Sequence, residues 1–178
     1  MKKLALSLAL VLIAGPVLAQ SLGEKTGINA LVGKAPSTQD FATLVAISDM
    51  FEIESSKLAE QKADEASKKF AAQMISDHTK TSNELKAMAP KAKVELPAAM
   101  DSSHQEKIDK LKSLNGAEFD KEYDAMQVKA HEDAVSLFER YADGGANPEL
   151  KAWAAKTLPD LKHHLDMAKA LRTQGPTN

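Results

Sequence analysis

Four ionisable side chains fall on the apolar faces of four different predicted helices: Glu52, His78, His131 and His164. A buried ionisable group costs free energy unless it is paired, hydrogen-bonded or bound to a metal. Carboxylate oxygens and neutral imidazole nitrogens are common ligands of transition metals. We therefore interpret these residues as candidate ligands of one transition-metal ion, with zinc, copper and iron all left open.

Four long helical patterns must position these residues. They span residues 38–62, 64–89, 116–144 and 147–172. In each, apolar residues recur at helical spacing, and the breaks between the patterns contain proline, glycine or capping residues such as Ser37 and Asn147. Strand alternation continues nowhere over a useful length, so the sequence predicts an all-α fold.

The connection between the second and third helices, residues 90–115, is too long for a tight turn. Its second half, 102–114, has a short helical pattern of its own. Such a link can return along the whole bundle, which would make helices two and three parallel. Two antiparallel pairs joined by one long crossover form a ferritin-like four-helix bundle. The predicted division is a signal peptide, a flexible tether, this bundle and a disordered tail: 1–19, 20–37, 38–173 and 174–178.

The four candidate ligands are predicted to lie at one depth in the bundle. At a rise of about 1.5 Å per residue, Glu52 lies roughly 15 Å from the end of its helix and His78 about 20 Å from the start of the next. His131 and His164 lie roughly 22 Å and 25 Å along theirs. Because the bundle would be about 40 Å long, all four side chains reach its middle third.

Three further residues are candidates to support these ligands by hydrogen bonding. Asp77 lies one step around its helix from His78. Asp120 and Tyr123 precede His131 on the third helix. We expect these side chains to orient the ligands rather than bind the ion.

A di-iron centre of the ferritin type is disfavoured. Such a centre needs about four carboxylates and a Glu-x-x-His motif on each of two helices, and no Glu-x-x-His occurs in the sequence. Asp160 and His163 have the same spacing as that motif, but both lie on the polar face of the last helix. His164 is therefore predicted to be the inward residue. A single ion is therefore the better interpretation, with catalysis only where a coordination position stays open.

The first nineteen residues are typical of a secretory signal peptide. Lys2 and Lys3 precede an apolar run, and a small-residue cleavage site ends at Ala19. Cleavage after Ala19 predicts export to a bacterial periplasm. The apolar run is too short for a membrane span, and no cysteine follows Ala19 to carry a lipid. We expect no integral membrane span in the mature chain.

The charge of the mature chain argues against nucleic acid as a partner. Cleavage removes two of the 23 basic residues and none of the 25 acidic ones, which leaves a net charge near −4. Nucleic-acid binding would require a basic stripe. The chain also contains no cysteine, so a single apolar core must stabilise it without disulfides.

Four segments carry a resemblance to a known family. They are residues 41–59, Phe70-Ala-Ala-Gln-Met-Ile-Ser-Asp-His-Thr79, 116–131 and 154–168 with its Leu-Pro-Asp-Leu-Lys-His-His sequence. Together they span almost the whole mature chain. It resembles a bacterial family of exported proteins, domain of unknown function 4142, whose members are often labelled outer membrane proteins. The resemblance implies a ferritin-like fold and places His164 in the last motif, but it implies no activity.

Two classes of function are consistent with these residues. The leading hypothesis is an exported bundle that binds one transition-metal ion in its core, for metal buffering or stress protection. In the alternative, the same residues form a metal-free hydrogen-bonded network. The protein would then be a structural or interaction module of the cell envelope, with a protein partner there. A metal-dependent oxidoreductase is a third interpretation and needs an opening to the bundle centre.

Overall fold

Helices make up most of residues 32–174. The computed structural model describes these residues together with 23 and 30, and the other positions lie outside the described residues. The helices are α3 (Thr38–Lys62), α4 (Glu65–Ala92), α5 (Ser102–Ser113), α6 (Gly116–Gly144) and α7 (Pro148–Gln174). No strand occurs in this part of the chain. The predicted all-α class is therefore confirmed.

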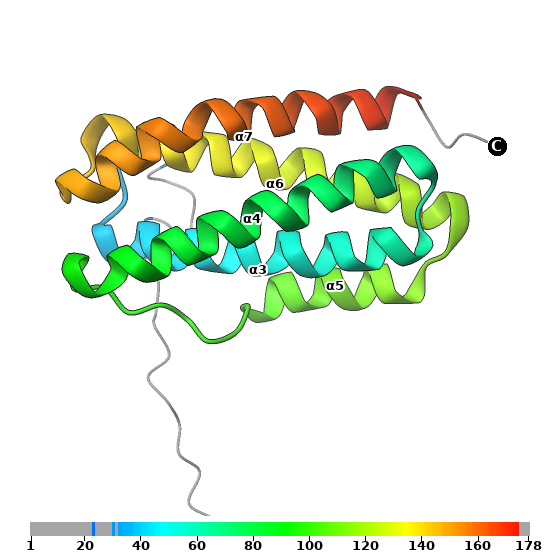
Figure 1. Cartoon of the computed structure of the whole chain (residues 1–178), viewed down its shortest axis with the longest axis horizontal. Coiled ribbons are helices and arrows are strands. Elements are labelled where there is room, and N and C mark those ends of the chain that lie inside the picture. The colour runs from blue at the N-terminus through cyan, green and yellow to red at the C-terminus, as the bar shows by residue number, and fades with distance from the viewer. Residues whose placement is uncertain (1–22, 24–29, 31, 175–178) are drawn as a thin grey trace, which may run out of the picture.

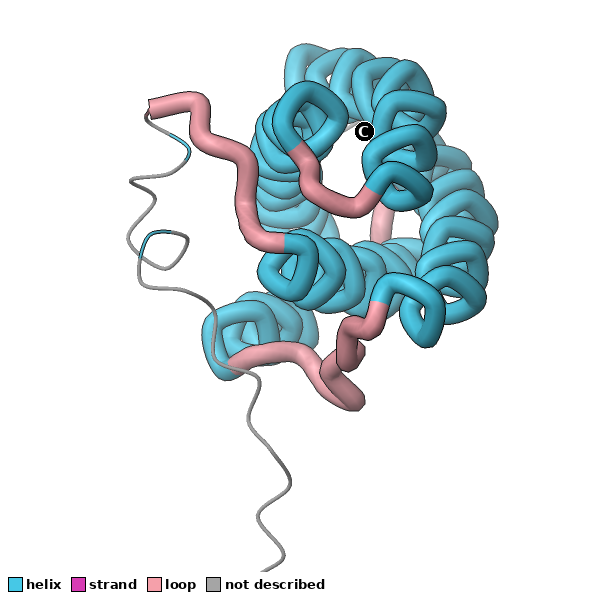
Figure 2. The backbone as a smooth tube through the Cα atoms, turned by 90° about the vertical axis from the view of Figure 1, so that its left-hand side faces the viewer, coloured by secondary structure: helices cyan, strands magenta, loops and turns pink. Residues whose placement is uncertain are grey.

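The four long helices form two antiparallel pairs. α3 packs most extensively against α4, and α6 against α7, while α3 also contacts α6 and α4 contacts α7. The crossover returns the chain through α5, so that α4 and α6 run in the same direction (Figure 1). Seen end-on, the long helices surround the core and α5 lies outside them (Figure 2), where it packs mainly on α3. This is the predicted bundle with its long crossover.

The helix ends follow local side-chain chemistry. The side chains of Ser37, Asp64 and Asp101 each accept a backbone N–H at the start of a helix, which satisfies donors that have no partner within the helix. α4 extends to Ala92, beyond the end predicted at Pro90. A proline in the last turn removes only one helical hydrogen bond, and left-handed Lys93 closes the end by donating to carbonyls of that turn.

The apolar core is divided into two clusters. One contains Phe41, Leu85, Phe138, Tyr141 and Trp153 among others. The second contains, among others, Phe70, Met74, Leu111, Phe119 and Tyr123. Both belong to the same bundle, and the buried polar residues of the middle helical turns lie between them. The polar layer is therefore enclosed along the bundle axis by apolar side chains.

The predicted signal peptide and most of the tether lie outside the described residues. Across the described positions, no helix combines the length and the apolar character that a membrane span requires.

We predict that Phe41→Ala destabilises the bundle by about 3–5 kcal/mol. The ring is fully buried, stacks on Tyr141 with centroids 3.9 Å apart and meets the edge of Phe138 at 5.2 Å. Its removal would leave a cavity in the first apolar cluster. Urea unfolding measures the loss, and Val32→Ala, at a side chain that is 68% exposed, is the control. A loss equal to that of the control would contradict this packing.

Candidate metal centre

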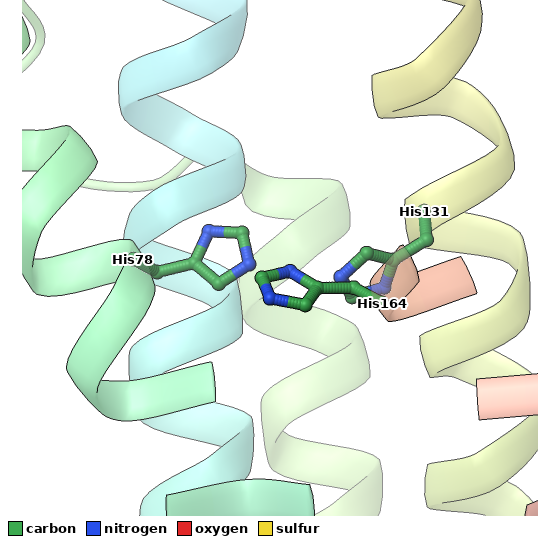
Figure 3. Close-up of side chains that lie close together, drawn as sticks. All are labelled: His78, His131 and His164. Atoms are coloured by element: carbon green, nitrogen blue, oxygen red, sulfur yellow. The ribbon is translucent and has the colours of Figure 1, made fainter. Parts of the chain in front are cut away.

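Three histidines from three helices meet in the middle of the bundle. His78 comes from α4, His131 from α6 and His164 from α7, and all three are at least 95% buried. Their rings point toward one another (Figure 3), with centroid separations of 5.7, 5.8 and 5.6 Å. One nitrogen of each ring lies within 4.8 Å of the other two. The triangle is nearly equilateral.

Each ring is held from outside by a hydrogen bond at its other nitrogen. His78 Nδ1 lies 2.8 Å from Asp49 Oδ1, and His164 Nε2 lies 3.0 Å from Asp77 Oδ2. His131 Nδ1 lies 2.9 Å from the carbonyl oxygen of Gln127, one turn earlier on α6. A carbonyl or an ionised carboxylate can only accept, so the outward nitrogens carry the protons. When all three rings are neutral, the inward nitrogens are therefore left with lone pairs.

The three inward atoms have no hydrogen-bond partner among the described residues. They are Nε2 of His78, Nε2 of His131 and Nδ1 of His164. A buried polar atom without a partner is costly. Three lone pairs that face one another also repel. A cation at their centre would relieve both penalties, and a hydrogen bond from the outer nitrogen to an acceptor is the usual support of a metal-binding histidine.

The spacing suits a transition metal after a small contraction. Zinc–nitrogen bonds of about 2.0–2.1 Å place the nitrogens of a tetrahedral site ~3.4 Å apart. From separations of up to 4.8 Å, each nitrogen would move by less than ~1 Å toward the centre.

Glu52 lies beside the triangle but outside the set of atoms within 4.8 Å of one another. It is 1% exposed, and neither carboxylate oxygen has a hydrogen-bond partner among the residues described. The side-chain amide of Gln127 donates to Ser55 Oγ at 3.2 Å. Burial raises the pKa of Glu52 to about 7, while the positive charge of His78 opposes this rise. Glu52 can therefore gain or lose a proton near neutral pH.

The charges around the triangle also favour a cation. Burial lowers the pKa of His131 to about 3, and lowers that of His164, so both rings are neutral at pH 7. Burial also lowers the pKa of His78, but the hydrogen bond and charge of Asp49 outweigh it and leave that pKa raised. Two carboxylates, those of Asp49 and Glu52, are buried in this region, whereas no lysine or arginine is buried in the described part of the chain.

The other residues predicted from the sequence have different neighbours. Asp77 accepts a hydrogen bond from His164 on the neighbouring helix α7, and not from His78 on its own helix. Asp120 accepts the backbone N–H of Asp64, and the Tyr123 hydroxyl lies 2.9 Å from Ser56 Oγ. Neither Asp120 nor Tyr123 is therefore hydrogen-bonded to a histidine of the triangle.

Sequence reasoning missed Asp49, the partner of His78. Asp49 is 3% exposed and precedes Glu52 by three residues on α3. Residues three apart share one helix face, and this spacing could have revealed it. The Gln127 carbonyl has no comparable signal because it belongs to the backbone. His163, in contrast to His164, is exposed.

The fold and the site define an all-α bundle with a buried histidine triangle. The chain belongs to the family described as Domain of unknown function (DUF4142), whose model matches residues 25–171. No curated protein matches it. Among solved structures it is similar to "CopM in the Cu(II)-bound form", with a TM-score of 0.65 and 20% sequence identity. The match covers 79% of this chain and 98% of that one. This likeness concerns the fold.

We predict that Glu52→Gln stabilises the metal-free protein at high pH. The carboxyl has a pKa of about 7 in the folded state against an ordinary value of 4.5, so the folded state loses stability as the pH rises through this interval. A glutamine cannot ionise. At about 1.4 kcal/mol per pKa unit, the gain should be about 3 kcal/mol at about pH 8 and close to zero at about pH 4.

Urea unfolding in excess chelator measures the gain from Glu52→Gln at both pH values. Glu54→Gln, on the outer side of the same helix, is the matched control and should show no such dependence. An equal effect of Glu52→Gln at both pH values would mean that Glu52 does not titrate in this interval.

Proposed function

We propose that this protein is an exported bundle that binds one transition-metal ion between His78, His131 and His164. Glu52 is a buried carboxylate without a hydrogen-bond partner among the described residues, and it is the candidate fourth ligand. The biological role is metal buffering or protection against metal stress. Export rests on the signal-like residues 1–19 and the cleavage site after Ala19, which predict a periplasmic location.

One observation carries this proposal. The three histidines come from separate helices, their outer nitrogens are bonded to acceptors, and their inner nitrogens face one another without partners among the described residues. A histidine that serves only in packing needs no such arrangement. The outer bonds fix the ring orientation that presents three lone pairs to one point. Asp49 and Asp77 would hold two of the rings in this orientation.

The donor set narrows the choice of ion. Three imidazoles and one carboxylate suit zinc, copper or iron better than the oxygen-preferring magnesium or calcium. The likeness to a copper-bound protein is a reason to test copper early. A four-coordinate site with Glu52 bound would be closed, whereas three histidines alone would leave a position for water.

We predict one tightly bound ion per chain in untagged protein purified without chelating resin. His131→Ala and His164→Ala should each weaken binding by at least about 100-fold, because a metal with three protein ligands then loses one of them. Metal analysis and competition with a chelator give the stoichiometry and the affinity.

His163→Ala and His104→Ala are the matched controls, since each removes a histidine that lies outside the triangle. Both should keep the stoichiometry and the affinity of the wild type. Wild-type protein that contains no metal and cannot be loaded with zinc, copper or iron would refute the proposed function.

A metal-free polar network is the second candidate, and the buried Asp49–His78 pair favours it. These two side chains are 2.8 Å apart and each is 4% exposed. A protonated His78 carries a proton on Nε2, which could be donated to the inward nitrogen of a neighbouring ring. The bundle would then be a structural or interaction module of the envelope, and its function would lie on the surface.

We predict that chelator lowers the thermal stability of the protein as isolated. An ion present at about 100 times its dissociation constant adds about 2.7 kcal/mol to the free energy of unfolding. Thermal unfolding before and after dialysis against chelator measures the change, and addition of the ion should restore it. Under the metal-free alternative, chelator leaves the midpoint unchanged.

A further inference from the structure

A groove of about 390 Å³ runs along the surface between α4 and α7. These two helices lie side by side and antiparallel (Figure 1), but they contact each other less extensively than the partners within each hairpin do. The lining of the groove includes two histidines of the triangle, His78 and His164. The groove therefore connects solvent with the outer edge of the site.

A second, smaller cavity lies next to the groove and shares part of its lining. This cavity of about 20 Å³ lies beside Asp49 and has room for a water molecule. Both cavities share the same four lining residues: His78, Thr81, Thr157 and Leu161. The Thr81 hydroxyl lies 3.0 Å from each Asp49 oxygen. Two small polar side chains thus stand between solvent and the interior next to His78.

The other sides of the triangle are covered. The two apolar clusters close it along the bundle axis. On the α3 side, Glu52 is 1% exposed, and on the α6 side His131 is 1% exposed and meets the edge of Phe70 with ring centroids 6.2 Å apart. The α4–α7 seam is therefore the side on which a surface groove reaches two of the three rings.

We infer that the groove is the route by which a transition-metal cation enters and leaves the histidine triangle, with Thr81 and Thr157 as its gate. This inference rests on the proposed metal binding and concerns the rates at which the ion enters and leaves the site. The ion is captured at the mouth of the groove before it passes the gate. The inward Nδ1 of His164 then receives it, because this ring lines the groove and also belongs to the triangle.

The groove wall offers suitable groups for this first capture. The carboxylate of Asp160, the exposed imidazole of His163 and the thioether of Met167 line it one helical turn or less from His164. These are oxygen, nitrogen and sulfur donors, but they do not form a set of three close ligand atoms like the triangle. They would hold an ion briefly rather than store it.

A residue on the route changes rates without changing affinity. It lowers the same barrier in both directions, so entry and exit slow by one factor when it is removed. We expect His163→Ala and Asp160→Asn to slow loading by about 3- to 10-fold, with release slowed equally. Thr157→Ala should accelerate both steps, because it widens the gate.

Stopped-flow mixing with Co²⁺ measures loading from the visible absorption of the ion, and transfer of the bound Co²⁺ to excess chelator measures release. The matched controls are His104→Ala and Asp109→Asn on α5, and Thr43→Ala, a buried threonine that lines neither cavity. Thermal unfolding of each variant verifies that it is folded. The controls should load and release Co²⁺ at wild-type rates.

The outcomes separate this inference from the proposed function. If the wild type binds one ion but the three groove variants keep wild-type rates, the route is wrong and the metal site stands. If His163→Ala weakens the equilibrium affinity as strongly as His164→Ala does, the groove residue is a ligand and the route is also wrong. A wild type that takes up no ion refutes the proposed function, and the route with it.

Discussion

The structure depends on one constraint: a layer of buried polar atoms interrupts an otherwise apolar core. The layer contains three imidazoles and the carboxylates of Asp49 and Glu52, with an apolar cluster on either side. Each buried polar atom must find a partner or cost the fold free energy. The outer nitrogens of the histidines have partners within the protein. Among the described residues, the inner nitrogens have no hydrogen-bond partner and face one another.

The topology makes this layer feasible. Two hairpins joined by a long crossover bring the middle turns of four helices to one level, so three of the helices each contribute one histidine and α3 contributes Asp49 and Glu52. Two of the acceptors come from neighbouring helices. Asp49 on α3 accepts from His78 on α4, and Asp77 on α4 accepts from His164 on α7. The hydrogen bond between Asp77 and His164 also links the two hairpins, because α4 belongs to the first hairpin and α7 to the second.

A polar layer of this kind is not a means of maximising stability. A bundle with well-packed apolar residues in its place would generally be as stable or more stable. The cost is accepted where the layer provides specificity or a binding site. In the proposed function the ion supplies the missing interactions, so metal content and folding stability are coupled. The less closely packed α4–α7 seam would then allow exchange without unfolding.

The sequence by itself determined the four helices, their capping residues, the crossover and the common depth of His78, His131 and His164. These features follow from helical periodicity and a constant rise per residue, which are local properties. Only the tertiary structure decided which acceptor each ring uses, that Asp49 joins the layer and that Glu52 stays outside the 4.8 Å set. Such choices depend on the rotation of each helix and on side-chain rotamers. Periodicity fixes neither, least of all on α3, whose apolar face has no unique phase.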